Sequence, residues 1–302
     1  MKSKICIGTA QFGMEYGITN NKGATSTEEI SKIIRTCEKE SVRYIDTAMN
    51  YGSSEKKLGE CIKDKELFKL ITKISGEECL DNGRFSTVKA DKALRDSLAR
   101  LKVLKLEGLL VHDPEVLNTH AGREILEWMM QKKMDGRICN IGISIYEKED
   151  ITENIINYID MVQVPVSVFD QRIIRNGGID WMFDHGIKIF ARSIFLQGIL
   201  LTKSISGYKL SNDLKKHHER WVKDLERKKR SQLQECVNFV ASIEKIEALT
   251  IGIENNDQLS QIIQVAENVN EDYETKDTLE WGYTKINDID PRRWRTNKEK
   301  SS

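Results

Sequence analysis

Eight short apolar segments, separated by longer stretches with helical periodicity, constrain the fold of this 302-residue chain more than any other feature. Each segment has the length of a buried strand, and the stretches between them are long enough for helices. The segments are Ile5–Gly8, Tyr44–Asp46, Lys69–Ile74, Leu106–His112, Ile138–Gly142, Met161–Val164, Ile187–Phe190 and Ala248–Gly252.

Three of the intervening stretches carry apolar residues at the spacing of one helix face, and we expect all three faces to pack in the core. Ser26 and Glu29 have the spacing of a capping box at the start of the first of these helices. The apolar residues are Ile30, Ile33, Ile34 and Cys37, then Leu94, Leu98, Leu101 and Leu104, and then Ile125, Leu126, Trp128 and Met129.

This alternation predicts an α/β protein, a (β/α)8 TIM barrel that forms a single domain. Eight units in about 250 residues fit a closed barrel better than an open doubly wound sheet. The open sheet of a dinucleotide-binding fold would carry G-x-G-x-x-G, and the segment 8–13 matches neither this pattern nor a P-loop. Only three prolines and no Gly/Ser-rich linker interrupt the chain.

Two polar regions lie outside this pattern. Residues 203–231 predict a long loop and a solvated helix beyond the seventh strand. The tail after Asn270 is also polar, but Trp281, Tyr283 and Trp294 indicate that it packs on the barrel. We expect residues 296–302 to be disordered.

The charge and cysteine content exclude several classes of protein. Lys plus Arg and Asp plus Glu both number 47, so the formal net charge is zero and gives no case for nucleic acid or a membrane surface. Six scattered cysteines without a C-x-x-C pair indicate buried or free thiols. We expect no signal peptide, no membrane span and a cytoplasmic location, with a monomer as the default.

Four polar residues lie at or just beyond the ends of the second, third and fourth apolar segments: Asp46, Tyr51, Lys73 and His112. Because these strand ends are adjacent at one mouth of a barrel, we expect the four side chains to converge. A buried lysine beside a phenol favours the phenolate, and a carboxylate would compensate the charge of the lysine. A histidine could orient a carbonyl oxygen, so the set predicts an acid system that protonates an oxyanion.

Other chemistry has weaker support. Residues 142–146 fail the G-x-S-x-G pattern at the fifth position, and no spacing typical of metal ligands is present. Taken singly, each of the four residues also has a structural interpretation, such as a loop aromatic, a lysine at a strand end or a histidine that caps a turn. Their occurrence at successive strand ends favours catalysis.

The residues around Tyr51 also resemble the signature of the aldo-keto reductase superfamily, TIM-barrel enzymes that reduce carbonyl compounds with nicotinamide cofactors. The match is I-D-T-A-x-x-Y-G-x-x-E-x-x-L-G over residues 45–59, and it continues with the Lys73, His112 and Ser144 strands in the family's order. The resemblance covers residues 4–268, so we expect a single domain over 1–302 with a tail at 270–302. It implies that Tyr51 donates the proton, that Lys73 and Asp46 tune it, and that His112 orients the carbonyl.

The resemblance also implies a binding site for the dinucleotide. Residues at the end of the first strand lie near the nicotinamide ribose, and later strands supply contacts to the carboxamide, the pyrophosphate and the adenosine. These positions are Gly8 and Thr9, then Ser144 and Gln163, then Arg192, Ser193, Phe195, Gln197 and Gly198, and finally Gly252, Glu254 and Gln258.

Three positions depart from the family pattern. Ile145 stands where many members have an Asn that contacts the carboxamide, and Arg192 stands where an aromatic ring often stacks on the nicotinamide. A guanidinium plane can also stack, but it adds charge. Glu254 stands where an Arg commonly binds the 2′-phosphate of NADP, which argues for NADH or for use of both cofactors. On balance we expect NADPH slightly ahead of NADH, and no metal.

The substrate is expected to be a small-molecule aldehyde or ketone. The run Phe169–Arg172 resembles reductases suspected of acting on sugars or their nucleotide conjugates, and Gln11, Phe12, Tyr16, Phe169 and Trp281 are candidates for the pocket wall. Two alternatives remain open at this point. One is a regulatory barrel that binds a dinucleotide without turnover, and the other is a lyase or isomerase in which Lys73 forms a Schiff base.

Overall fold

Eight parallel strands form a closed barrel in the computed structural model, which describes residues 4–20, 22–268, 273 and 276–294. Around the barrel the strand order is β1, β10, β9, β8, β7, β6, β3, β2. The strands are β1 (Ile5–Gly8), β2 (Tyr44–Asp46), β3 (Lys69–Ile74), β6 (Leu106–Val111), β7 (Ile138–Ser144), β8 (Met161–Pro165), β9 (Lys188–Arg192) and β10 (Ile246–Gly252). The predicted fold class is confirmed, and all eight predicted strands are present with bounds that differ by at most two residues.

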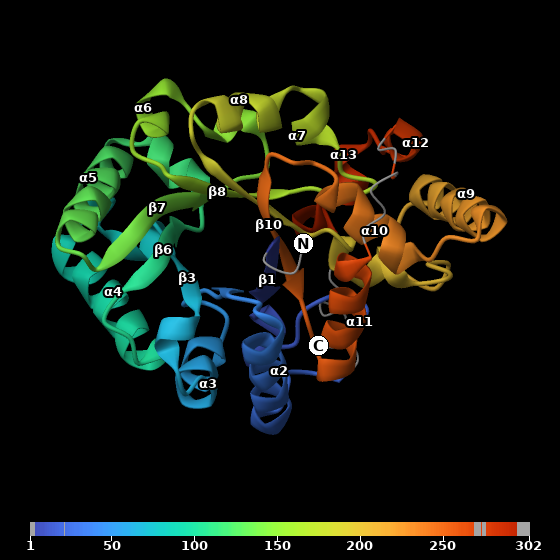
Figure 1. Cartoon of the computed structure of the whole chain (residues 1–302). Helices are drawn as coiled ribbons and strands as arrows, with labels where there is room; N and C mark the ends of the chain where they lie inside the picture. Colours follow the sequence, from blue (N-terminus) through green and yellow to red (C-terminus); the bar gives the residue numbers. More distant parts are fainter. Residues whose placement is uncertain (1–3, 21, 269–272, 274–275, 295–302) are drawn as a thin grey trace, which may run out of the picture.

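A ring of helices surrounds the strands (Figure 1), with α2 to α5 along one half and α8, α10 and α11 along the other. The longer helices are α2 (Thr27–Glu40), α3 (Ser54–Cys61), α4 (Thr87–Leu101), α5 (His120–Met134), α8 (Gly178–Asp184), α9 (Asn212–Lys228), α10 (Gln232–Ala241) and α11 (Asn256–Glu267). The short ones are α1 (Ala10–Gly13), α6 (Glu153–Ile156), α7 (Arg172–Arg175), α12 (Lys276–Leu279) and α13 (Ile286–Ile289). Outside the barrel, β4 (Leu80–Asp81) and β5 (Arg84–Phe85) form a small antiparallel pair.

Short 3₁₀ helices occupy several connections, and two of them lie near the carboxyl ends of the strands: η6, which follows β9, and η7, the last described element. Their bounds are η2 (Lys65–Leu67), η3 (Glu77–Cys79), η4 (Pro114–Asn118), η5 (Lys148–Asp150), η6 (Leu196–Leu201) and η7 (Pro291–Arg293).

The strands are apolar because side chains on both of their faces are buried. One set fills the interior of the barrel, and the other packs against the helices. The interior cluster consists of Cys6, Tyr44, Ile71, Leu110, Met161, Phe190 and Ala248. Because this cluster closes the barrel, polar chemistry is restricted to its ends.

Helix α2 begins at the predicted cap, although its capping box is incomplete. The Ser26 hydroxyl accepts a hydrogen bond from the Glu29 backbone N–H at 3.2 Å. The Glu29 carboxylate does not return to Ser26; it accepts from the backbone N–H of Asn256 at 2.7 Å, at the start of α11. A tertiary contact between two neighbouring helices has replaced the local one.

The predicted apolar stripe of α4 is wrong at its last position. Helix α4 ends at Leu101 because Lys102 adopts a left-handed backbone with φ of 57°. The chain then turns, and Leu104 is 81% exposed, whereas Leu94 and Leu101 are buried. Periodicity alone does not reveal where a helix ends.

Helix α9 is less solvated than predicted, because one of its faces is buried through Leu214 and Trp221. The aromatic tail packs on the barrel as predicted: Trp281, Tyr283 and Trp294 contact the core. The backbone N–H of Tyr283 donates to the carbonyl of Phe169 at 2.8 Å. The predicted disorder of residues 296–302 lies outside the described residues.

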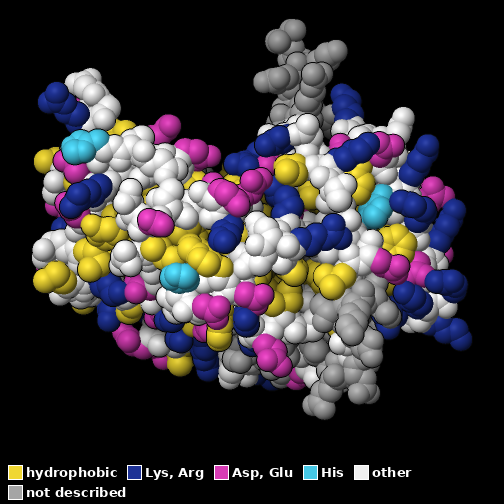
Figure 2. Space-filling view, turned by 90° about the horizontal axis from the view of Figure 1, so that it is seen from above, with side chains coloured by type: hydrophobic (Ala, Val, Ile, Leu, Met, Phe, Trp, Pro, Cys, Tyr) yellow, Lys and Arg dark blue, Asp and Glu magenta, His cyan; other side chains and the backbone are white. Residues whose placement is uncertain are grey.

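The surface is charged without a large region of one sign on the face shown in Figure 2, where Lys and Arg side chains alternate with Asp and Glu. None of the helices in the described part of the chain is long and apolar enough to cross a membrane. All six cysteines are free, and four of them are buried.

Candidate active site

The four polar residues predicted to act together line one cavity at the carboxyl ends of the strands. Asp46 is the last residue of β2, Lys73 lies in β3, and His112 follows β6 directly. Tyr51 lies in the turn between β2 and α3. All four contribute to the wall of a cavity of about 500 Å³.

Lys73 and Asp46 form a buried ion pair at the base of this cavity. The ammonium donates to the two carboxylate oxygens at 2.6 and 2.7 Å and to the Thr47 carbonyl at 3.0 Å. The side chains are 1% and 5% exposed. Burial alone would lower the pKa of Lys73, but the Asp46 carboxylate and the Tyr51 phenol raise it, so the lysine stays charged.

Gln163 extends the ion pair across the barrel. Its amide nitrogen donates to Asp46 Oδ1 at 2.5 Å. Gln163 is fully buried in β8, and its amide oxygen has no hydrogen-bond partner among the described residues. One side chain therefore fixes the carboxylate and leaves an acceptor available in the cavity.

Tyr51 lies beside the ammonium, and the Lys73 Nζ is 5.0 Å from the centre of the phenol ring. Two glycines set the position of the Tyr51 backbone. A Cβ on Gly13 would lie 1.7 Å from the Tyr51 carbonyl oxygen, and Gly52 has a positive φ of 55°. Only glycine permits this close approach and this turn.

His112 is neutral in this environment. Burial, together with the nearby charge of Lys73, lowers its pKa from 6.5 to about 4. Its ring meets that of Tyr51 in an edge-to-face arrangement, with 6.0 Å between the ring centres. The neutral imidazole has one N–H donor, and its position determines what the ring can do.

The contact with Asn50 determines which ring nitrogen of His112 carries the proton. The sequence did not predict a role for Asn50. Its amide nitrogen lies 3.1 Å from His112 Nδ1. An amide nitrogen only donates, so Nδ1 accepts and the proton of the neutral ring is on Nε2. Asn50 directly precedes Tyr51, and this adjacency was the one signal in the sequence that could have indicated its role.

Every residue predicted from the resemblance to contact a dinucleotide lines the same cavity. Those residues are Gly8, Thr9, Ser144, Gln163, Arg192, Ser193, Phe195, Gln197, Gly198, Gly252, Glu254 and Gln258. Of the candidate wall residues, Gln11 and Tyr16 line the cavity, whereas Phe12 and Phe169 are fully buried core residues and Trp281 packs beside the core.

The backbone after β9 is bent around the cavity. Ser193, Leu196 and Gln197 have positive φ angles of 59°, 45° and 52°, and Gly198 has 95°. Non-glycine residues rarely adopt this region, and runs of such residues gather at functional sites. Asn255 caps α11 on the opposite side through the backbone N–H of Gln258, at 2.9 Å.

Unpaired polar atoms are concentrated along this cavity, which fits a polar ligand. Four of its lining residues carry a buried side-chain atom without a partner in the described part of the chain: Gln11 Oε1, Gln163 Oε1, Arg192 Nε and Thr250 Oγ1. Buried polar atoms in proteins are normally satisfied, so each of these favours a bound partner. Within the described residues, no group of three or more His, Cys, Asp or Glu side chains is placed to hold a metal ion.

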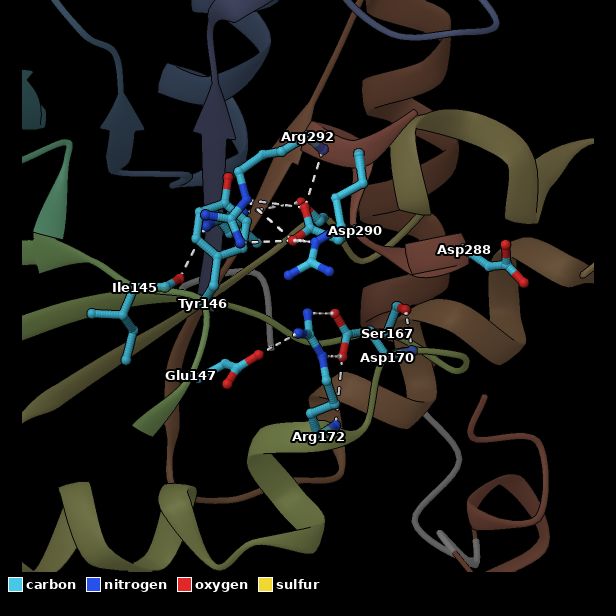
Figure 3. A network of polar contacts seen from close by, with 12 residues as sticks. Ile145, Tyr146, Glu147, Ser167, Asp170, Arg172, Asp288, Asp290 and Arg292 are labelled. Carbon is cyan, nitrogen blue, oxygen red and sulfur yellow. Dashed lines mark hydrogen bonds and ion pairs between the residues drawn. The ribbon is translucent and has the colours of Figure 1, made fainter. Parts of the chain in front are cut away.

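The tail adds a network at the rim of the cavity that the sequence did not predict (Figure 3). Arg292 donates to the buried Asp290 carboxylate, and its guanidinium lies 3.3 Å from the centre of the Tyr146 ring. Nearby, Arg172 bonds to Asp170 and Glu147. The tail is thus anchored beside the residues that follow β7.

Two solved aldo-keto reductases have the same fold. AKR11C1 from Bacillus halodurans, in its holo form, superposes with a TM-score of 0.75 at 17% identity and covers 96% of this chain and 95% of its own. The thermostable aldo-keto reductase Tm1743, in complex with the inhibitor epalrestat, gives a TM-score of 0.70 at 21% identity, with 92% and 95% covered. These likenesses show the fold. None of the curated protein sequences compared matches significantly.

The sequence itself matches a family model. The model of the Aldo/keto reductase family covers residues 4–280, which is most of the chain and includes all four residues of the catalytic prediction. The protein therefore belongs to the aldo/keto reductase family and is an oxidoreductase of carbonyl compounds.

Proposed function

We propose that the protein reduces an aldehyde or ketone to an alcohol by hydride transfer from a nicotinamide dinucleotide, with Tyr51 as the proton donor. One observation carries the proposal: the phenol, its lysine, the carboxylate and a neutral histidine line the same cavity as all twelve predicted cofactor contacts. The two sets were predicted from separate parts of the sequence.

Tyr51 gives a proton to the carbonyl oxygen as negative charge develops there. The Lys73 ammonium stabilises the phenolate that remains, because it is charged, buried and beside the ring. Asp46 keeps the ammonium in place through two hydrogen bonds. A lysine held in its charged form is a poor nucleophile, so the arrangement disfavours the Schiff-base alternative.

His112 orients the substrate. With Nδ1 accepting from Asn50, Nε2–H is the remaining donor of the ring and can bond the carbonyl oxygen. Because the pKa of His112 is about 4, the ring is neutral at pH 7 and does not compete with Tyr51 as the acid.

The dinucleotide supplies the hydride when it is bound, and residues of this chain would hold it along the cavity. Ser144 and the free amide oxygen of Gln163 would bind the carboxamide. The bent segment at 192–198 would follow the pyrophosphate, and Gly252, Glu254 and Gln258 would surround the adenosine. We propose NADPH slightly ahead of NADH, with Glu254 favouring use of NADH as well, since its carboxylate repels a 2′-phosphate.

A sugar or nucleotide-sugar carbonyl is the candidate substrate, from the resemblance of residues 169–172 described above. We also propose a cytoplasmic monomer. Six free cysteines support a reducing compartment, because oxidising compartments favour disulfides.

Replacement of Tyr51 by phenylalanine tests the proposal. We expect kcat/KM for 4-nitrobenzaldehyde to fall 10²- to 10⁴-fold, about 3–5 kcal/mol of transition-state stabilisation. Fluorescence titration should give dissociation constants for NADPH and NADH within about twofold of the native values. Tyr158→Phe is a matched control, because Tyr158 precedes β8 at the other end of the barrel.

Retained turnover in the Tyr51 variant would refute the assignment of the proton donor. If the native protein binds a dinucleotide tightly but oxidises it with none of a panel of aldehydes, the regulatory barrel is the better description. If it binds neither dinucleotide, the proposal fails as a whole.

A further inference from the structure

Arg192 is among the proposed contacts of the dinucleotide, but the proton and hydride transfers described above give its positive charge no role. It is the last residue of β9, and its guanidinium is partly buried in the cavity wall. Nη2 donates to the Ile145 carbonyl at 3.0 Å, and Nη1 contacts the Ser193 hydroxyl at 3.5 Å. Arginine has five N–H donors, so most of them lack an acceptor among the described residues.

The charge of Arg192 is also uncompensated, unlike that of the arginines around it. In the rim network of Figure 3, Arg172 pairs with Asp170 and Glu147, and Arg292 pairs with Asp290. Within the described residues, no carboxylate oxygen lies within 4.0 Å of the Arg192 nitrogens in an ion pair. At the chemical end of the cavity, Lys73 and Asp46 cancel each other, which leaves Arg192 as the net charge.

The guanidinium is also held in position. The ring of Tyr146 lies 4.3 Å from the Arg192 guanidinium carbon and 3.3 Å from that of Arg292. Arg292 is in turn fixed by Asp290, which is fully buried. A planar group that is ordered before binding loses little entropy when a ligand arrives.

Arg192 lines the same cavity as Tyr51 and His112, between which the substrate carbonyl would lie. Its guanidinium is held at the carbonyl of Ile145, directly after the last residue of β7. Oxyanions are the ligands that a fixed guanidinium binds best.

We propose that Arg192 binds a carboxylate or phosphate group carried by the carbonyl substrate, so that the enzyme selects anionic aldehydes or ketones over neutral ones. This inference rests on the proposed function, because it assumes carbonyl reduction in the same cavity. The phosphates of the dinucleotide are the other possible source of an oxyanion, and the experiment separates the two sources.

The test compares pairs of aldehydes that differ in charge: 4-carboxybenzaldehyde with 4-nitrobenzaldehyde, and glyceraldehyde 3-phosphate with glyceraldehyde. For each pair, kcat/KM is measured in the native protein and in Arg192→Gln, Arg192→Lys and Arg175→Gln. Arg175 is a matched control because it is exposed and bonds only to the Leu279 carbonyl in the described structure. Calorimetry with benzoate and fluorescence titrations with NADH and NADPH supply readouts that do not depend on turnover.

We expect the native protein to prefer the anionic member of at least one pair by about 10- to 100-fold, the scale of a charge-assisted hydrogen bond. In Arg192→Gln the ratio of kcat/KM for the anionic aldehyde to kcat/KM for the neutral one should be close to one, and benzoate should bind more weakly. Arg192→Lys should keep part of the native preference, and Arg175→Gln should keep all of it. Because Arg192 is also among the proposed cofactor contacts, kcat/KM is measured for each variant at a saturating concentration of the dinucleotide, set from its own fluorescence titration.

A native ratio of one or below, or a ratio that survives in Arg192→Gln, would overturn the inference. Weaker dinucleotide binding with an intact ratio would assign the oxyanion to the cofactor and overturn it as well. If no aldehyde is turned over, the proposed function fails, and benzoate binding still decides whether Arg192 is an oxyanion site.

Discussion

Replacement of Asp46 by asparagine would leave the ammonium of Lys73 buried without its counter-charge. Lys73 is 1% exposed and donates to both Asp46 oxygens and to the Thr47 carbonyl. In the variant only neutral acceptors remain. Breaking a buried ion pair by removing one partner costs about 3–5 kcal/mol of unfolding free energy.

The structure also sets a ceiling on this loss, because Lys73 can release its proton. The gap between its ordinary pKa of 10.5 and pH 7 corresponds to about 5 kcal/mol. If the variant folds with a neutral lysine, the unfolded chain binds one more proton than the folded one up to pH 10.5. The unfolding free energy of the variant should therefore rise with pH. Its difference from the native protein should shrink by about 3 kcal/mol between pH 7 and pH 9.5.

Urea denaturation of the native protein, Asp46→Asn, Lys73→Met and the double variant Asp46→Asn/Lys73→Met at both pH values measures these quantities. The double variant removes both charges, so it should lose less stability than the two single changes add up to. Asp96→Asn is the control: Asp96 pairs with Lys92 on the surface, where solvent screens the charges, so its loss should leave the urea midpoint close to the native value. The reasoning is refuted if Asp46→Asn lowers the unfolding free energy by less than about 1 kcal/mol and if this difference from the native protein is the same at both pH values.

Three further predictions concern the residues around the phenol. The pKa of His112 is about 4 in the folded state and 6.5 in the unfolded state, so the unfolding free energy should fall as the pH drops from 6.5 to 4. Urea titrations should show a fall of up to about 3 kcal/mol that is absent in His112→Gln. Asn50→Asp should make Nδ1 of His112 the donor and raise the pKa of this histidine. We expect kcat/KM to fall at least about tenfold and the acidic limb of its pH profile to move to higher pH. An acidic limb at the native pH would contradict the assigned tautomer. Gly13→Ala would drive a Cβ into the Tyr51 carbonyl, so we expect a loss on the order of 3 kcal/mol by thermal unfolding and reduced kcat; a neutral effect would show that the turn is not rigid.

The sequence predicted the barrel well because its strands are short apolar runs, and burial of both strand faces is a property of each segment by itself. The same logic placed Asp46, Lys73 and His112, since a polar residue at or next to the end of an apolar run lies near a strand end. Local patterns were weaker at helix ends. Leu104 fits the spacing of α4 but lies beyond the left-handed turn at Lys102, which periodicity does not register.

Contacts between distant segments could not be predicted, because they depend on how completed elements pack. The stack of Arg292 on Tyr146, the bond from Glu29 to the start of α11 and the orientation of His112 by Asn50 all join side chains that no local pattern links. The sequence by itself therefore determined which residues reach the mouth of the barrel. Only the tertiary structure decided which charges there are paired, and Arg192 is unpaired because the neighbouring carboxylates bond to other arginines.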